Sequence, residues 1–268
     1  MKDLPIRTLV AIVLISLLTL VIWLGGIVQA AVLGLFAAIA VLEINAVFRQ
    51  KGTKPFIVPT VALAASLFFV LLFFGKEWML LECCIAFAAI AFERVINKSR
   101  TNDDLIAAVF LLLYPTALMS CFGFIGFEGD VSRIAFLSVF AGVAMADNTA
   151  YMIGSLIGKH KLCPSISPKK SVEGAVAGLI GGAVGGLIPY FMQRLWGLEL
   201  PLWPLIAICF FAGLVGQLGD LFASSFKRWA GVKDFGKIFP GHGGIIDRLD
   251  SAMFAVPFVV LAFRILFK

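Results

Sequence analysis

Long apolar runs dominate this chain of 268 residues and limit it to one class of fold. Sixty-one per cent of its residues are hydrophobic and 14% are charged, whereas soluble domains carry about 25% charged residues. An apolar run of about 20 residues is long enough to cross a bilayer as a helix. The sequence therefore predicts an all-α, polytopic helical integral membrane protein that forms a single membrane domain over residues 1–268.

Nine apolar runs have the length of membrane spans. They cover residues 7–24, 27–48, 56–74, 78–94, 104–122, 133–157, 173–192, 204–224 and 250–267. With the amino terminus placed inside, 17 of the 22 Lys and Arg residues fall in inside segments. Because Lys and Arg are enriched in cytoplasmic loops, we expect a multi-pass protein of the inner (cytoplasmic) membrane whose rich polar loops face the cytoplasm. The first run also resembles a signal peptide, but its length favours an uncleaved span.

The two halves of the chain differ in polar content. Residues 1–122 contain few polar side chains and are expected to be mainly structural, whereas residues 133–268 are expected to hold the catalytic helices and cytoplasmic loops. Glycines spaced four residues apart in 173–192, and similar small residues in 204–224, predict closely packed helices. These seams could alternatively pack a homodimer. The five cysteines include no CxxC pair, and two histidines are too few for a histidine-based metal site.

Two glutamates of the first half lie near the ends of predicted spans. Glu43 precedes Arg49, and Glu93 is followed by Arg94. Ion pairing at the membrane interface is the simpler interpretation of both. The alternative is that these carboxylates line the mouth of a cavity.

Carboxylates also lie within or beside three apolar runs of the second half. Asp147, followed by Asn148, is inside the sixth run, Asp220 lies near the end of the eighth, Asp247 precedes the ninth and Asp250 opens it. An ionisable side chain in a span is a functional-site candidate, although Asp147 could also be a buried group that holds helices together. Asp220 and Asp247 could bind Mg²⁺ through oxygen, with phosphate oxygens and water completing its coordination.

Basic residues precede the seventh run. Lys169 and Lys170 stand directly before Ser171, which is expected to be the N-cap of a helix. Backbone N–H groups at a helix start, together with two ammonium groups, favour an anion. Ordinary anchoring by inside-facing positive charge explains the two lysines equally well.

A second basic group lies at the end of the eighth run. Ser224, Lys227 and Arg228 return to the same helix face as Asp220. A carboxylate one or two turns from two cations suits a metal with bound phosphate. A neutralised ion pair at the lipid boundary is the alternative.

A glycine-rich turn joins this group to the ninth run. Gly243 and Gly244 follow His242 in the segment PGHGG. Glycine permits a tight turn and lets backbone N–H groups face an anion. We therefore expect this turn to help to bind a phosphate.

These segments together resemble a known family. The chain carries SSFKRWAGVKDFGKIFPGHGGIIDRLDS over residues 224–251, with DNTAYMIGSLIGKHKL and SPKKSVEG upstream. This long signature resembles that of the phosphatidate cytidylyltransferases, also called CDP-diacylglycerol synthases, over roughly residues 145–257. The resemblance implies that CTP and phosphatidic acid react to give CDP-diacylglycerol and pyrophosphate, as a step of phospholipid biosynthesis.

The resemblance also implies which residues act. Mg²⁺, with a second cation as an option, would be held by Asp220, Asp247 and Asp250. The expected catalytic residues are Asp220, Lys227, Arg228, Lys233, Asp247 and Arg248. The expected substrate-binding residues are Asp147, Lys169, Lys170, Ser224, Lys237, His242, Gly243 and Gly244. The expected partners are CTP, phosphatidic acid and the lipid bilayer, with a homodimer as a further option and no nucleic acid.

Two other functions stay open at this point. A CTP-dependent kinase of polyprenol or phytol type would share CTP, Mg²⁺ and a lipid, and it differs in transferring only a phosphate. A membrane transporter would explain Asp147 and the glycines, but the sequence shows no internal repeat of the kind on which many transporters are built.

Overall fold

The protein is described by a computed structural model that covers residues 16–17, 19–126, 129–239, 241 and 243–267. The chain forms two compact units, each built from two stretches of sequence. Unit 1 comprises residues 1–123 and 230–248, and unit 2 comprises residues 124–229 and 249–268. The single domain with halves at 1–122 and 133–268 stays a prediction.

The described residues are mostly helical, and several helices have the length and composition of membrane spans. Six helical stretches qualify: α2 (Gly26–Gln50), α5 to α6 (Asn102–Ile125), α7 (Asp130–Ile157), α8 to η2 (Val172–Trp196), α10 (Leu202–Ala230) and α11 (Ile246–Leu266). The predicted third and fourth spans are the helices α3 (Ile57–Phe73) and α4 (Lys76–Ile96). The first predicted span lies mostly outside the described residues. The all-α polytopic architecture is thus confirmed, whereas the count of nine spans is not.

Large apolar side chains stay exposed along the helices. Leu113 is 62% exposed, Leu156 is 77% exposed and Trp203 is 76% exposed. Exposed apolar surface on this scale marks contact with a membrane or another protein. Because it occurs on the helices long enough to span a bilayer, lipid is its natural solvent.

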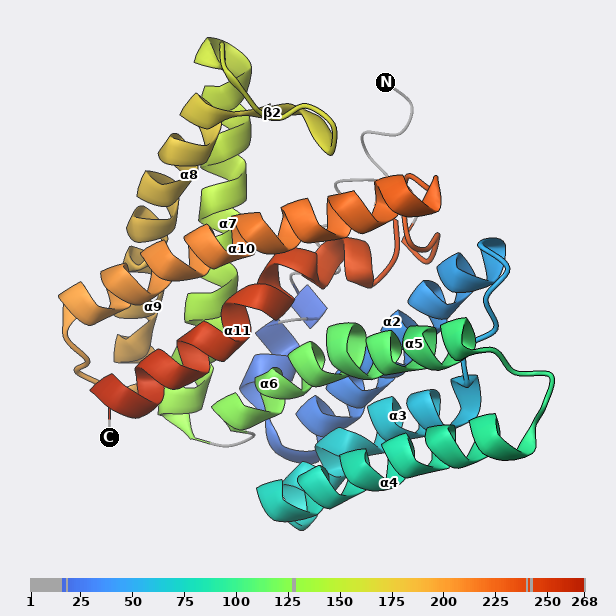
Figure 1. The fold of residues 1–268 in the computed structure, drawn as a ribbon. Helices are drawn as coiled ribbons and strands as arrows, with labels where there is room; N and C mark the ends of the chain where they lie inside the picture. The colour runs from blue at the N-terminus through green and yellow to red at the C-terminus, as the bar shows by residue number, and fades with distance from the viewer. Residues whose placement is uncertain (1–15, 18, 127–128, 240, 242, 268) are drawn as a thin grey trace. The chain divides into compact units, whose positions relative to one another are not determined.

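Unit 1 is a bundle in which successive helices are neighbours. α2 packs on α3, α3 on α4, and α4 on α5, while α5 and the segment after it return to α2 (Figure 1). Ile44, Leu67 and Leu111 are buried in this bundle and come from α2, α3 and α5. The apolar core of unit 1 therefore joins helices that are consecutive in sequence.

A proline changes the helical geometry in the middle of the fifth predicted span. α5 (Asn102–Leu111) passes through a π-helical segment, η1 (Leu112–Ala117), into α6 (Leu118–Ile125). Pro115 has no N–H and cannot bond the carbonyl of Leu111, four residues earlier. The Thr116 hydroxyl donates to that carbonyl instead, at 2.9 Å. The buried carbonyl is therefore satisfied, and the span continues past the proline.

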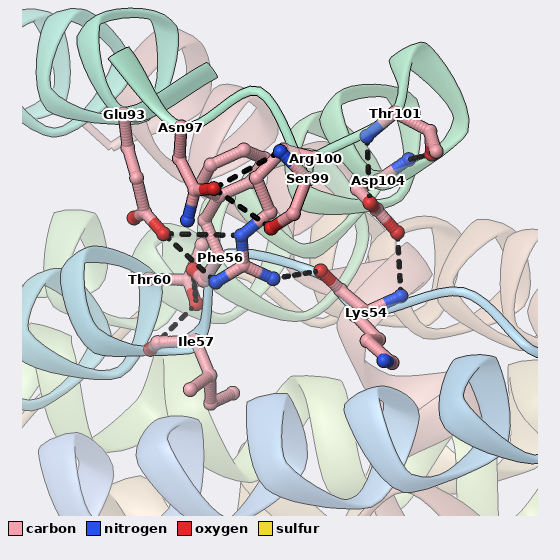
Figure 2. Close-up of polar contacts among 10 residues, drawn as sticks. All are labelled: Lys54, Phe56, Ile57, Thr60, Glu93, Asn97, Ser99, Arg100, Thr101 and Asp104. Carbon is pink, nitrogen blue, oxygen red and sulfur yellow. Dashed lines mark hydrogen bonds and ion pairs between the residues drawn. The ribbon is translucent and has the colours of Figure 1, made fainter.

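The start of α5 is fixed by a capping box. Thr101 accepts a hydrogen bond from the Asp104 N–H at 3.1 Å, and Asp104 accepts one from the Thr101 N–H at 2.8 Å. The other Asp104 oxygen accepts from the Lys54 N–H at 2.6 Å. One buried carboxylate thus caps a helix and holds the chain segment before α3 (Figure 2).

Arg100 completes this junction. Its guanidinium donates to the Lys54 carbonyl at 2.7 Å, pairs with Glu93 at 2.8 Å and lies 4.6 Å from the centre of the Phe56 ring (Figure 2). The ion pair expected for Glu93 is therefore present, but its partner is Arg100 and not the neighbouring Arg94. Arg100 is better placed because it follows the end of α4, where the chain turns back toward the carboxylate.

In unit 2, glycines allow α7 and α8 (Val172–Gly185) to pack closely. A Cβ atom added to Gly174 would lie 2.7 Å from the Ala150 carbonyl oxygen, and one added to Gly185 would lie 2.7 Å from that of Ala141. Neither position has room for a side chain. The predicted close packing of helices at the glycine seam is confirmed, and α7 and α8 lie side by side in Figure 1.

α10 has a similar seam toward its neighbours in unit 2. A Cβ atom added to Gly213 would lie 2.8 Å from that of Ala146 on α7, and one added to Gly219 would lie 2.7 Å from the Asp250 carbonyl oxygen on α11. The close approach at Gly219 places the neighbouring Asp220 near Asp250.

A short β-hairpin precedes α8, where the sequence predicted only a loop. β1 (Lys161–Cys163) pairs antiparallel with β2 (Ser167–Ser171). Strands of three and five residues are too short to leave a clear alternating pattern. Ser171 is the N-cap of α8, as predicted, and accepts from the Gly174 N–H at 3.1 Å.

Candidate active site

Unit 2 brings Lys170 and Asp220 together. Lys170 lies on β2 and Asp220 in the second half of α10, and their side chains form an ion pair in which each is 28% exposed. The hairpin makes this possible, because it folds Lys170 back toward α10. Lys169, the neighbour of Lys170, is exposed.

Asp250 lies close to the same ion pair. Its side chain on α11 is buried and within electrostatic reach of Asp220, Lys227 and Asp147. We call Asp147, Asp220 and Asp250 the carboxylate cluster. Its members come from α7, α10 and α11, and Lys170 and Lys227 supply the opposite charge.

Two predicted site residues of α10 have contacts of a different kind. The Ser224 hydroxyl lies 3.5 Å from an Asp220 oxygen, at the outer limit for a hydrogen bond. Arg228 donates to the Ile166 carbonyl in the hairpin turn at 3.2 Å and is exposed. Arg228 thus links α10 to the hairpin that carries Lys170, and its contact with substrate stays a prediction.

The carboxylate cluster suits Mg²⁺ by its chemistry. Mg²⁺ is usually bound by one or two carboxylates together with substrate phosphates and water, and Asp220 and Asp250 can supply that number. Within the described ranges, no group of three or more His, Cys, Asp or Glu side chains has the geometry of a complete metal site. A cation at Asp220 would have to share this carboxylate with Lys170 or displace the lysine.

Unit 1 contains the other part of the predicted site, the segment of residues 235–246, which we call the glycine loop. Asp247 closes its base, because one carboxylate oxygen accepts from the Phe235 N–H at 2.8 Å and from the Gly244 N–H at 3.0 Å. Gly243 has a φ of +82°, and a Cβ atom there would lie 2.7 Å from the Asp247 carboxylate. The turn thus requires glycine at this position. His242 lies outside the described residues.

Glu43, from α2, is a part of this site that the sequence did not predict. Its two carboxylate oxygens accept from the Ile245 and Ile246 N–H groups, each at 3.0 Å, and the side chain is 6% exposed. The expected pairing with Arg49 is therefore wrong, since the start of α11 supplies the donors. The rule that singled out Asp147, an ionisable residue inside an apolar run, also applies to Glu43.

These contacts bear on the predicted phosphate-binding turn. The N–H groups of Gly244, Ile245 and Ile246 already bond to the carboxylates of Asp247 and Glu43. A phosphate at the glycine loop would therefore depend on other donors. Lys233, Lys237 and Arg248 are exposed on and around the loop and could supply them. Asp220 and Asp247 belong to different units, so their convergence on one cation stays a prediction.

Comparison with known proteins places the chain in a family. The model of a protein family described as "Cytidylyltransferase family" matches residues 5–266. The chain belongs to the cytidylyltransferase family. This cytidylyltransferase is 34% identical over 257 residues to the phosphatidate cytidylyltransferase of Staphylococcus epidermidis, covering 94% of this chain and 96% of that protein. With the same coverage, it is 34% identical to the Staphylococcus haemolyticus protein of that name and 33% identical to the Staphylococcus aureus one.

Family membership extends beyond the signature that the sequence analysis used. The resemblance was limited to roughly residues 145–257, whereas the match covers nearly the whole chain. The helices of unit 1, including α2, therefore lie within the region that matches the family.

Proposed function

We propose that the protein transfers CMP from CTP to phosphatidic acid, giving CDP-diacylglycerol and pyrophosphate for phospholipid biosynthesis. The observation that carries this proposal is the match to phosphatidate cytidylyltransferases over 94% of the chain. The protein would therefore be a nucleotidyltransferase of the membrane. The acidic and basic groups described above supply the chemistry such a transfer needs.

In the proposed reaction, an oxygen of the lipid phosphate attacks the α-phosphorus of CTP. A bond forms between them as the bond from the α-phosphorus to the oxygen bridging to the β-phosphorus breaks, and pyrophosphate leaves. The attacking phosphate is already anionic at pH 7, so no strong general base is needed. Phosphoryl-type transfers depend mainly on alignment and charge stabilisation. Lys170 and Lys227 are suited to binding phosphate oxygens, as are Lys233 and Lys237.

We also propose Mg²⁺ as the cofactor, with a second cation as an option. When bound, a divalent cation neutralises phosphate charge and orients the triphosphate. Asp220 and Asp250 would hold it in unit 2, and Asp247 is the candidate ligand of unit 1. The hydrogen bonds that Asp247 accepts from two backbone N–H groups would orient its carboxylate, as is usual for metal-binding carboxylates.

The proposed location is the inner membrane, with the loops that bear the site facing the cytoplasm. CTP would enter from water and phosphatidic acid from the bilayer, so we expect a polar cavity with a lateral opening between helices. A homodimer stays a further proposal. Because the glycine seams of α8 and α10 are filled within unit 2, such a dimer would use another surface.

The position of the label in CTP tests this function against the alternatives. Purified protein in lipid nanodiscs would be given phosphatidic acid, Mg²⁺ and CTP labelled with ³²P at either the α- or the γ-phosphate. We expect α-label, and no γ-label, to enter the lipid, and chelation of Mg²⁺ to stop it. A polyprenol- or phytol-type kinase would transfer γ-label to its alcohol substrate, and a transporter would label no lipid. Either result would refute the proposal.

A further inference from the structure

Glu43 holds the base of the glycine loop, although it lies about 200 residues away in sequence. Its two oxygens bond to successive N–H groups, those of Ile245 and Ile246, where α11 begins. A buried carboxylate is costly unless donors satisfy it, and the start of a helix offers both free N–H groups and a favourable dipole. Glu43 and α11 therefore satisfy each other's polar requirements.

The loop backbone approaches this carboxylate too closely for a side chain to fit between them. A Cβ atom added to Gly244 would have Glu43 atoms as its three nearest neighbours, all closer than real Cβ contacts come. A Cβ atom added to Gly236 would meet the same carboxylate first. The two ends of the loop thus close on one side chain of α2, and there is no room for a methyl group on either side.

Asp247 belongs to the same arrangement. It bonds to Phe235 and Gly244, next to the positions that contact Glu43, and the two carboxylates are within electrostatic reach of each other. A movement of the Glu43 side chain would release the first turn of α11, which carries both Asp247 and Arg248. The placement of these side chains therefore depends on α2.

We propose that Glu43 is a positioning residue, whose carboxylate fixes the glycine loop and the first turn of α11 and so aims Asp247 toward the reaction. The proposal rests on the cytidylyltransferase function proposed above. It gives the helices before residue 123 a part in catalysis beyond structural support. Glu43 itself touches neither substrate nor cation in this scheme.

The first test compares Glu43→Gln with Glu93→Gln. A glutamine keeps one acceptor oxygen, so either Ile245 or Ile246 loses its partner, whereas Glu93→Gln weakens an ion pair at the α4–α5 junction. Loss of groups that orient metal-binding residues typically lowers activity or metal affinity by about 10- to 100-fold. We expect that loss in kcat for Glu43→Gln, with a higher Mg²⁺ requirement and unchanged KM for phosphatidic acid. Glu93→Gln should lower thermal stability and leave kcat unchanged.

Hydrogen exchange gives a readout that does not depend on activity. Exchange at the N–H groups of residues 244–246, measured by mass spectrometry in nanodiscs, should be faster in Glu43→Gln than in wild type or Glu93→Gln. Wild-type kcat together with wild-type exchange in Glu43→Gln would overturn the proposal. An inactive wild-type protein would instead overturn the cytidylyltransferase function, and exchange would still decide whether Glu43 holds the loop.

A double-mutant cycle tests the contact itself. Gly244→Ala should lower kcat strongly in the wild-type background, because the added methyl group collides with Glu43. The three atoms nearest to that methyl group all belong to Glu43. In a Glu43→Ala background the shorter side chain leaves space, so Gly244→Ala should cost little more. Such non-additivity is the signature of direct coupling. Additive losses would show that Gly244 acts through another group and would overturn the proposal. If Glu43→Ala does not fold, Gly244→Ala combined with Glu43→Asp, whose side chain is one methylene group shorter, provides the same comparison.

Discussion

Asp247 has two proposed roles, holding the glycine loop and binding a cation. Replacing it by asparagine separates these roles, because one carboxylate oxygen makes the contacts with the loop. That oxygen accepts from the N–H groups of Phe235 and Gly244 at 2.8 and 3.0 Å. Asparagine retains a carbonyl oxygen that can accept both bonds, but it lacks the charge that a metal ligand needs. Asp247→Asn should therefore preserve the glycine loop and remove most of the activity.

The effect of Asp247→Asn on stability and its effect on activity differ enough in size to be distinguished. Hydrogen bonds to charged groups contribute about 1.5–3 kcal/mol, and neutral ones about 1 kcal/mol. Two bonds made neutral should thus lower the free energy of unfolding by about 2 kcal/mol. A bound cation stabilises the charge of the transition state by several kcal/mol. Losing this stabilisation should lower kcat about a thousandfold, since each 1.36 kcal/mol is a factor of ten. Asp247→Ala would also leave two buried N–H groups unpaired, at about 1–3 kcal/mol each.

The assay measures transfer of α-label into lipid by purified Asp247→Asn, alongside its thermal unfolding and that of Asp247→Ala. We expect a folded, nearly inactive Asn variant and a clearly less stable Ala variant. An Asn variant with activity within a few-fold of wild type would remove Asp247 from the proposed metal site. Equal destabilisation of both variants would refute the structural task of its carboxylate oxygen.

Three further predictions concern other parts of the molecule. Lys227→Ala removes a charge near the carboxylate cluster and should raise KM for CTP about tenfold or more, the size of one charge-assisted contact; steady-state kinetics with varied CTP measures this, and an unchanged KM would refute it. Arg100→Ala loses an ion pair, a hydrogen bond to a carbonyl and a contact with an aromatic ring. It should lower the free energy of unfolding, measured by denaturant titration, by about 2–4 kcal/mol without changing kcat. The control variant Arg94→Ala should lower that free energy clearly less. Gly185→Val should cost about 1–3 kcal/mol or more through the collision with α7, whereas Val184→Leu, at an exposed position, should change stability by no more than about 0.5 kcal/mol; equal thermal stability of these two variants would contradict the packing argument.

The helices could be predicted well because hydrophobicity and helix ends leave local signals. The second predicted span, 27–48, corresponds to α2 at Gly26–Gln50, and Ser171 caps α8 as expected. The hairpin β1–β2 could not be predicted, since its eight strand residues show no distinctive pattern. Its effect on the site is large, because it brings Lys170 to Asp220.

Pairings across long sequence separations leave the weakest signal in the sequence. The sequence favours an ion pair for both Glu43 and Glu93; Glu93 forms one, with Arg100, whereas Glu43 bonds to backbone N–H groups at the start of α11. A carboxylate has no sequence signal for its donor when that donor is a backbone N–H group. The composition of a loop can indicate that an anion is bound, but it does not indicate which one.

The glycine loop is an example: its sequence indicates that an anion lies near the backbone but does not indicate which anion. Its glycines predicted an anion close to the backbone, and the structure places two there, the carboxylates of Glu43 and Asp247. The backbone can approach any anion closely only where no side chain intervenes, so glycine is required for a carboxylate as for a phosphate. Since the N–H groups of residues 244–246 are already bonded, a phosphate at the loop would need other donors, and we expect the charged side chains around the loop to supply them. These exposed lysines and Arg248 act over longer distances and are screened by salt. Binding of CTP should therefore weaken with rising ionic strength, while the geometry of the loop, which depends on buried carboxylates, should not change.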